Sequence, residues 1–157
     1  MGGAEHTFTT EVDPVTGTTA TTERDADGNI VSTTTTTLDG NKTVEFAPDD
    51  AGDVRVVEDG TETDPAGVTH TFHIERVKRA DGSSSFSGTD EGDDGSVSAT
   101  EGGQDADGNA SFTDRLTKAD GSVVLTTRTT DADGHGTEHI TVSDPDGTVV
   151  SDNTTDF

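Results

Sequence analysis

Short acidic motifs mark the places where this chain could bind a metal ion. The tetrapeptide Asp-Ala-Asp-Gly occurs three times, and its aspartates are Asp25, Asp27, Asp105, Asp107, Asp131 and Asp133. Closely spaced carboxylates beside a glycine suit Ca²⁺, a hard cation that takes about six to eight oxygen ligands. The helix-loop-helix calcium signature is absent, because no glutamate follows at the required spacing. These six aspartates are candidate Ca²⁺ ligands at one sheet margin, and the alternative interpretation is a set of ordinary turns.

The histidines do not form a metal-binding motif in the sequence. His70 and His73 are three residues apart, so on a strand they are expected to point to opposite faces. His135 and His139 share a face, but four residues of extended chain separate them by roughly 13 Å. Surface histidines are the expectation here, as they are for His6.

Residues that would support catalysis are sparse. The chain has no cysteine, no Gly-x-Ser-x-Gly elbow and no Asp-Thr-Gly or Asp-Ser-Gly motif. A hydrolase needs an activated nucleophile or a positioned acid and base, and carboxylate pairs are too numerous here to single one out. Tryptophan and tyrosine, the usual platforms of a polysaccharide groove, are also missing. The sequence therefore predicts a protein that is not an enzyme and that requires no cofactor, with Ca²⁺ as a candidate ligand.

A 13-residue repeat predicts the elements that carry these side chains. Asp-Gly dipeptides recur at this spacing, beginning at Asp81, Asp94, Asp107, Asp120, Asp133 and Asp146. Asp-Gly favours a two-residue type I′ turn, in which both central residues have positive φ. The segments between turns are therefore expected to be about eleven to thirteen strands of an elongated all-β antiparallel meander. We expect a single-layer or thin two-layer sheet, and the alternative fold is a β-solenoid.

The regularity of the repeat divides the chain into two regions. Residues 1–67 are expected to form an irregular β-hairpin region, with one of its turns at Asp59-Gly60. Residues 68–157 hold the regular 13-residue repeat, which the acidic stretch Asp90–Asp94 interrupts as an expected bulged loop. Both regions are expected to belong to one continuous sheet or sandwich.

The two-residue turn also predicts which side chains lie opposite one another. In that register Ala99, Leu116, Leu125 and Val142 form an apolar row across four strands, and Val124 is an exception on the opposite face. Phe86 and Phe112 flank Gly103, an arrangement in which an aromatic ring covers a strand glycine. A slip of one residue would exchange the two faces. The predicted assembly face contains Phe86, Ala99, Phe112, Leu116, Leu125, Ile140 and Val142.

Composition indicates a sheet with little core. Valine, isoleucine, leucine and phenylalanine total 27 residues, and the net charge is −24. Such values are typical of disordered chains, whereas the regular turns indicate order. We therefore expect a chain rich in backbone hydrogen bonds whose order is helped by partners, cations or salt. Nucleic acid is not an expected partner, since phosphate binding needs clustered arginine and lysine.

The expected location follows from the same composition. No apolar run approaches the length of a membrane span, and Met1–Phe8 lacks the apolar core of a signal peptide. The extracellular space or the cell surface is the expected location, reached by another export route or after loss of a leader. The alternative is the cytoplasm of a salt-loving organism, where excess carboxylates keep protein surfaces hydrated.

The hairpin cadence resembles the YD or Rhs repeats of bacterial surface and secreted proteins, whose strands are joined by Asp-x-x-Gly turns. Asp25-Ala26-Asp27-Gly28-Asn29 and Asp105-Ala106-Asp107-Gly108-Asn109 are similar to that turn, although the chain has no tyrosine, the residue that names the repeat. The resemblance implies a structural or adhesive role on the cell exterior.

The expected function is a structural repeat protein that assembles with itself. A one-sided apolar row on a single sheet must be covered, by residues 5–67 or by another subunit. Edge strands with unpaired backbone groups invite strand addition. A fibre or filament subunit, stalk or matrix component is therefore the first expectation. The alternatives are a Ca²⁺-responsive adhesion or binding module and an ice-binding threonine-rich sheet.

Overall fold

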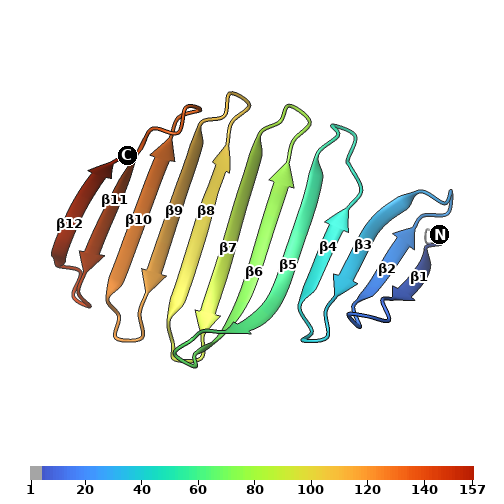
Figure 1. Ribbon diagram of the computed structural model, residues 1–157, viewed down its shortest axis with the longest axis horizontal. Helices are drawn as coiled ribbons and strands as arrows, with labels where there is room; N and C mark the ends of the chain where they lie inside the picture. Colours follow the sequence, from blue (N-terminus) through green and yellow to red (C-terminus); the bar gives the residue numbers. More distant parts are fainter. Residues whose placement is uncertain (1–4) are drawn as a thin grey trace.

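One open antiparallel sheet makes up the whole fold. The computed structural model describes residues 5–157, in which twelve strands pair in chain order from β1 to β12 (Figure 1). The strands are β1 Thr7–Val12, β2 Thr19–Arg24, β3 Ile30–Thr36, β4 Lys42–Phe46, β5 Val54–Thr63, β6 Thr69–Lys78, β7 Ser84–Gly92, β8 Val97–Gln104, β9 Ala110–Thr117, β10 Val123–Thr130, β11 Gly136–Ser143 and β12 Val149–Asp156. The predicted all-β meander is confirmed, and the solenoid alternative is wrong.

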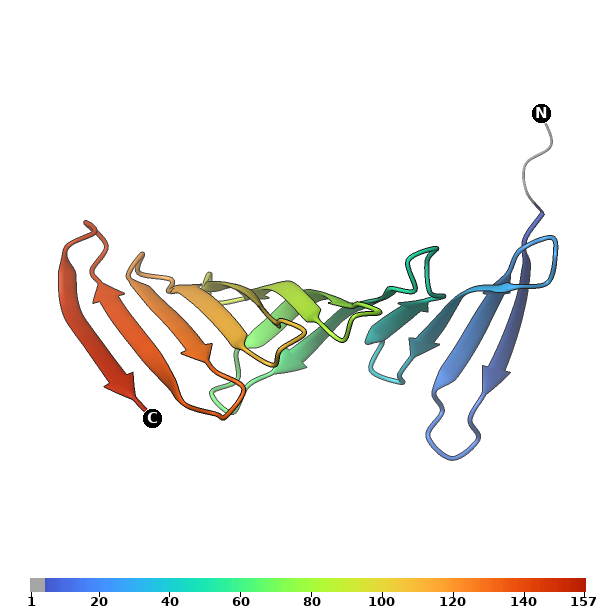
Figure 2. The ribbon, with the colours of Figure 1, turned by 90° about the horizontal axis from the view of Figure 1, so that it is seen from above.

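The sheet is a single twisted layer with both faces open to solvent. Figure 2 shows the strands edge-on, with no second layer behind them. Among residues 5–157 no large apolar side chain is buried, and Ser32 is the one buried polar residue, at 5% exposure. Strands β5 and β6 pair over ten residues and join the irregular region to the regular one. One continuous sheet therefore crosses the predicted boundary at residue 67, while residues 1–4 at the start of the first region lie outside the described residues.

The turns differ from the predicted type I′ geometry. In the turn after β8, Asp105 N–H donates to the Asn109 carbonyl at 2.9 Å, and Gly108 N–H donates to the Asp105 carbonyl at 3.1 Å. Gly108 has a φ of 94°, whereas no non-glycine residue of the described chain has positive φ. This is a three-residue hairpin loop, a type I turn followed by a glycine in the left-handed region. The residue before the glycine needs no positive φ in this loop, which explains why Ala51-Gly52 and Ala66-Gly67 form the same loop as the Asp-Gly pairs.

The longer loop shifts every predicted pairing in the repeat by one residue. Leu116 lies opposite Ser98 and Val124, and Leu125 lies opposite Arg115 and Thr141. The predicted row of Ala99, Leu116, Leu125 and Val142 is therefore wrong, because paired residues share a face and neighbouring residues do not.

The same shift moves the glycine that the aromatic rings cover. Phe86 and Phe112 both pair with Gly102, not with the predicted Gly103. Their ring centroids are 6.3 Å apart across β8. A Cβ atom on Gly102 would lie 2.8 Å from the Phe86 ring and 2.6 Å from the Ser111 carbonyl oxygen. Glycine is required there because the ring occupies the space of a side chain.

Two further turn predictions are corrected. Gly60 lies inside β5, where Asn41, directly before β4, and the Phe72 ring of β6 approach it. The acidic stretch Asp90–Asp94 is not a bulged loop, because β7 continues to Gly92 and a standard loop follows. There Gly92 N–H donates to the Ser96 carbonyl at 2.8 Å, and Gly95 N–H donates to the Gly92 carbonyl at 3.0 Å.

Candidate functional site

The aspartates of the repeated motif hold their own turns together. One oxygen of Asp105, Oδ1, accepts the backbone N–H of Asp107 at 3.0 Å and of Asn109 at 2.9 Å. The other, Oδ2, accepts the Asn109 side-chain amide at 2.9 Å. These bonds, led by the one from the Asn109 side chain, lower the pKa of Asp105 below its ordinary value. Asp25 makes the same three contacts with its own loop. The motif therefore has a structural use that does not involve a metal.

The six candidate calcium ligands do not gather into one site. The turns that begin at Asp105 and Asp131 are neighbours on one margin, since a Cβ on Gly108 would lie 3.2 Å from the Ala132 Cβ. The one cluster with metal-binding spacing in residues 5–157 is Asp131, Asp133 and His135, all exposed and within 4.8 Å of one another. It comes from a single turn, and Asp131 Oδ1 already accepts two backbone N–H groups of that turn. Ca²⁺ binding stays a prediction.

Four histidines pair with acidic side chains of neighbouring strands, which sequence reasoning missed. His70 Nδ1 lies 2.6 Å from Asp90 Oδ1, and this hydrogen bond raises the pKa of His70. His73 lies 2.6 Å from Asp59 on the opposite face, as expected for residues three apart. His6 and His139 make similar contacts with Glu23 and Asp152. Only a correct register could have revealed these pairs.

Negative charge is concentrated at the two margins of the sheet. The twelve strands contain 14 acidic and 7 basic residues, whereas the remaining segments contain 19 acidic and 2 basic residues. Those segments are almost entirely the turns that run along both ends of the strands (Figure 1). The strands thus carry a net charge of −7, and the segments between and beside them carry −17. Repulsion between two such sheets would come mainly from exposed carboxylates, which salt screens.

One face of strands β5–β11 gathers most of the large apolar side chains. We call it the apolar face, and it contains Val54, Val56, Phe72, Ile74, Phe86, Phe112, Leu116, Val124, Ile140 and Val142. Its charged groups are partly paired: Arg76 forms an ion pair with Glu58, and Ser98 donates to Asp114 at 2.6 Å. All ten apolar side chains are half-buried by their neighbours on the sheet. A second layer would complete their burial.

Five residues of the predicted assembly face lie together on this face, namely Phe86, Phe112, Leu116, Ile140 and Val142. Ala99 and Leu125 lie on the opposite face, where both pair with Arg115. Val124, predicted as the exception, belongs to the apolar face as the partner of Leu116 and Val142. The one-residue longer loop accounts for all three differences.

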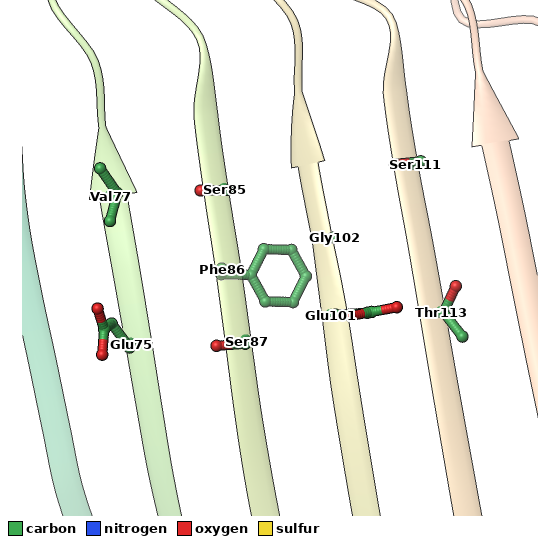
Figure 3. Close-up of a pocket in the computed structure, with 9 residues that line it drawn as sticks. All are labelled: Glu75, Val77, Ser85, Phe86, Ser87, Glu101, Gly102, Ser111 and Thr113. Atoms are coloured by element: carbon green, nitrogen blue, oxygen red, sulfur yellow. The ribbon is translucent and has the colours of Figure 1, made fainter.

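A shallow hollow crosses the middle of the sheet (Figure 3). It has a volume of about 410 Å³ and is lined by Glu75, Val77, Ser85, Phe86, Ser87, Glu101, Gly102, Ser111 and Thr113. The close-up shows the Phe86 ring reaching from its own strand toward Gly102. The carboxylate of Glu75 is held by Arg55 at 2.8 and 3.0 Å. No histidine is among the residues that line the hollow.

Two strand edges remain open at the ends of the sheet. Strand β1 pairs with β2 alone and β12 pairs with β11 alone, so each presents one row of free backbone groups. Every residue of both strands is exposed. Such edges are templates for another strand unless charge, proline or a bulge blocks them. The open edges and the apolar face are the surfaces with the clearest capacity to bind another polypeptide.

Comparison of the chain with protein-family models, with curated proteins and with solved structures finds no match. None of the described segments is a helix long and apolar enough to cross a membrane. Function is therefore inferred from the fold, the charges and the exposed surfaces.

Proposed function

We propose that this chain is a non-enzymatic structural protein whose sheets assemble with one another outside the cell, as a fibre, stalk or matrix component. The observation that carries the proposal is the single open layer: no large apolar side chain of residues 5–157 is buried, although ten of them share one face. A sheet needs a packed hydrophobic face for stability of its own. A second copy of the same sheet would provide that packing.

The size of the apolar face supports this role. Seven strands spaced about 4.8 Å apart, each about eight residues long at about 3.3 Å per residue, span roughly 900 Å². Stable protein interfaces bury about 800 Å² on each partner. Two copies stacked through this face would meet that requirement at the usual distance of about 10 Å between packed sheets.

The charge distribution supports it as well. Carboxylates crowd the turns, so two apolar faces can meet while the strongest repulsion stays at solvated margins. Charges on such margins are screened over a distance of about 8 Å at physiological salt. Assembly should therefore strengthen as ionic strength rises.

Neighbouring cysteine substitutions test this proposal. Thr126 lies on the apolar face between Asp114 and Ile140, whereas Thr127 lies on the opposite face between Thr113 and His139. Both side chains are half-buried and the chain has no cysteine of its own. The measurement is the alkylation rate of Thr126→Cys and Thr127→Cys over a hundredfold range of protein concentration. Alkylation of the Thr126→Cys thiol should slow at least tenfold as concentration rises, while that of the Thr127→Cys thiol should stay constant.

Two results would count against the proposal. Rates that do not change with concentration for either thiol would mean that the apolar face is never covered by another copy. A rate that falls for Thr127→Cys alone would place the contact on the opposite face.

A further inference from the structure

The free backbone groups of β1 belong to three uncharged residues. Directly after β1, Asp13 N–H donates to the carbonyl of Thr18, the residue before β2, and the direction of N–H groups alternates along a strand. Phe8, Thr10 and Val12 therefore turn their N–H and C=O groups away from the sheet. Phe8 and Val12, at 65% and 62%, are the most exposed large apolar side chains of any described strand. This edge has no proline, lysine or aspartate at its outward positions.

Negatively charged side chains occupy outward positions of β12, the opposite edge of the sheet. Phe157 exchanges both backbone hydrogen bonds with Gly136, so the outward positions of β12 near its end are Asp152, Thr154 and Asp156. Two copies of β12 centred on Thr154 would place Asp152 directly opposite Asp156 of the second copy. Like charges directly opposite one another destabilise a strand pair.

Strand β1 complements itself. We propose, resting on the self-assembly proposed above, that two copies pair antiparallel through β1 about a two-fold axis at Thr10. In this register Phe8 lies opposite Val12 of the second copy, an aromatic and β-branched pair that favours cross-strand packing. Thr10 lies opposite its own counterpart, as it already lies opposite Thr21 within the chain, with hydroxyl oxygens 2.9 Å apart. Glu11 lies opposite Thr9, so no like charges face each other.

Pairing β1 with β12 of another copy is less favourable. With Thr10 opposite Thr154, the same spacing places Phe8 opposite Asp156 and Val12 opposite Asp152. Each apolar side chain then faces a carboxylate. Two-fold pairing through β1 instead yields one continuous sheet of two chains. At each outer end lies β12, whose outward aspartates disfavour further strand pairing. Growth beyond the pair then proceeds through the apolar face.

A cysteine at position 10 tests the register. Opposite residues of an antiparallel pair have Cα atoms about 5.5 Å apart, within the range of about 4.4–6.8 Å that a disulfide needs. Mild oxidation of Thr10→Cys should therefore yield a covalent dimer. Val12→Cys is the matched control, because its two copies would lie four residues out of register, roughly 13 Å apart. We expect at least tenfold more crosslinked Thr10→Cys than Val12→Cys.

Proline at either edge provides a second test. Thr10→Pro removes an outward N–H of β1, and Thr154→Pro removes an outward N–H of β12, without deleting a hydrogen bond inside the sheet. The molar mass by sedimentation should fall for Thr10→Pro and stay at the wild-type value for Thr154→Pro. Equal loss in both variants would overturn the two-fold pairing in favour of β1 joining β12.

The outcomes separate this inference from the proposed function. A wild-type chain that assembles while Thr10→Cys crosslinks no better than Val12→Cys would overturn the pairing through β1 and leave self-assembly standing. A wild-type chain that stays monomeric at every concentration would overturn both.

Discussion

A carboxylate in the centre of the apolar face should break assembly, while the same change on the other face should not. Leu116 packs beside Val124, with Val142 on the next strand, and is half-buried. Full burial of a leucine is worth about 1.5–3 kcal/mol, and burying a carboxylate without a partner costs several more. Leu116→Asp should therefore weaken association by about 2–4 kcal/mol, which is roughly 30-fold to 900-fold in the dissociation constant.

Leu125→Asp is the matched control on the opposite face. Leu125 is 36% exposed and lies opposite Arg115, so a carboxylate there stays in water beside a guanidinium group. The expected change in association is below about 0.5 kcal/mol, roughly twofold. Sedimentation equilibrium of both variants and of wild type in high salt gives the two dissociation constants. Equal weakening by both variants would refute the register and the assignment of faces; a larger effect of Leu125→Asp would reverse the faces.

Three further outcomes are expected. Gly102→Ala should lower the free energy of unfolding by about 1–3 kcal/mol in urea melts, because its Cβ meets the Phe86 ring and a backbone carbonyl, whereas Thr100→Ala on the same strand should cost less. The carboxyl of Asp105 has a lowered pKa in the folded state, so its contribution to stability is present above the ordinary value of 3.8 and is lost as pH falls through the folded pKa. In acid titrations followed by circular dichroism, Asp105→Asn should therefore lose less stability over this range than wild type. An unchanged profile would contradict the role of Asp105 in holding its turn. His70 has a raised pKa in the folded state, so its contribution to stability is complete below about pH 6.5 and is lost as pH rises through the folded pKa. The melting temperature of wild type, but not of His70→Gln, should therefore fall across that pH window. Parallel pH profiles for the two proteins would show that the pair with Asp90 does not contribute to stability.

The strands and their order were predictable because the repeat is long and its Asp-Gly glycines recur every 13 residues. Each glycine at the end of an Asp-Gly pair in the 13-residue repeat has positive φ in the structure, so every one of those turns was located correctly. Gly60 was misplaced because an Asp-Gly pair inside a strand looks the same in sequence. What distinguishes it is the Phe72 ring that fills the space above it, a contact between neighbouring strands.

Which side chains lie on which face of the sheet could be predicted only as well as the turn type could. The carboxylate of Asp105 accepts two backbone N–H groups and thereby favours the three-residue loop over the two-residue one. One added loop residue moved Leu125 to the opposite face and Val124 onto the apolar face. Apolar pattern alone could not decide this, because Val123, Val124 and Leu125 are consecutive and either register buries some of them.

The candidate metal ligands illustrate the same limit. Asp25, Asp105 and Asp131 have the composition of cation ligands, and the sequence places them at turns on one margin. The hydrogen bonds that occupy their oxygens depend on loop geometry, and so do the distances between turns. Ca²⁺ binding at these turns therefore stays a prediction. At fixed ionic strength, a melting temperature that Ca²⁺ raises more than Mg²⁺ does would support it, and equal effects of the two ions would count against it.

The central claim, that this single sheet depends on other copies of itself, is tested most directly by following structure and mass together on dilution. The measurement is far-ultraviolet circular dichroism with sedimentation velocity over a hundredfold dilution series, at low and at high salt. Mass action predicts that the β signal and the molar mass fall together on dilution, and that salt shifts both transitions to lower concentration by screening the charge of −24. A chain that remains monomeric with its full β signal at every dilution in low salt would contradict the claim.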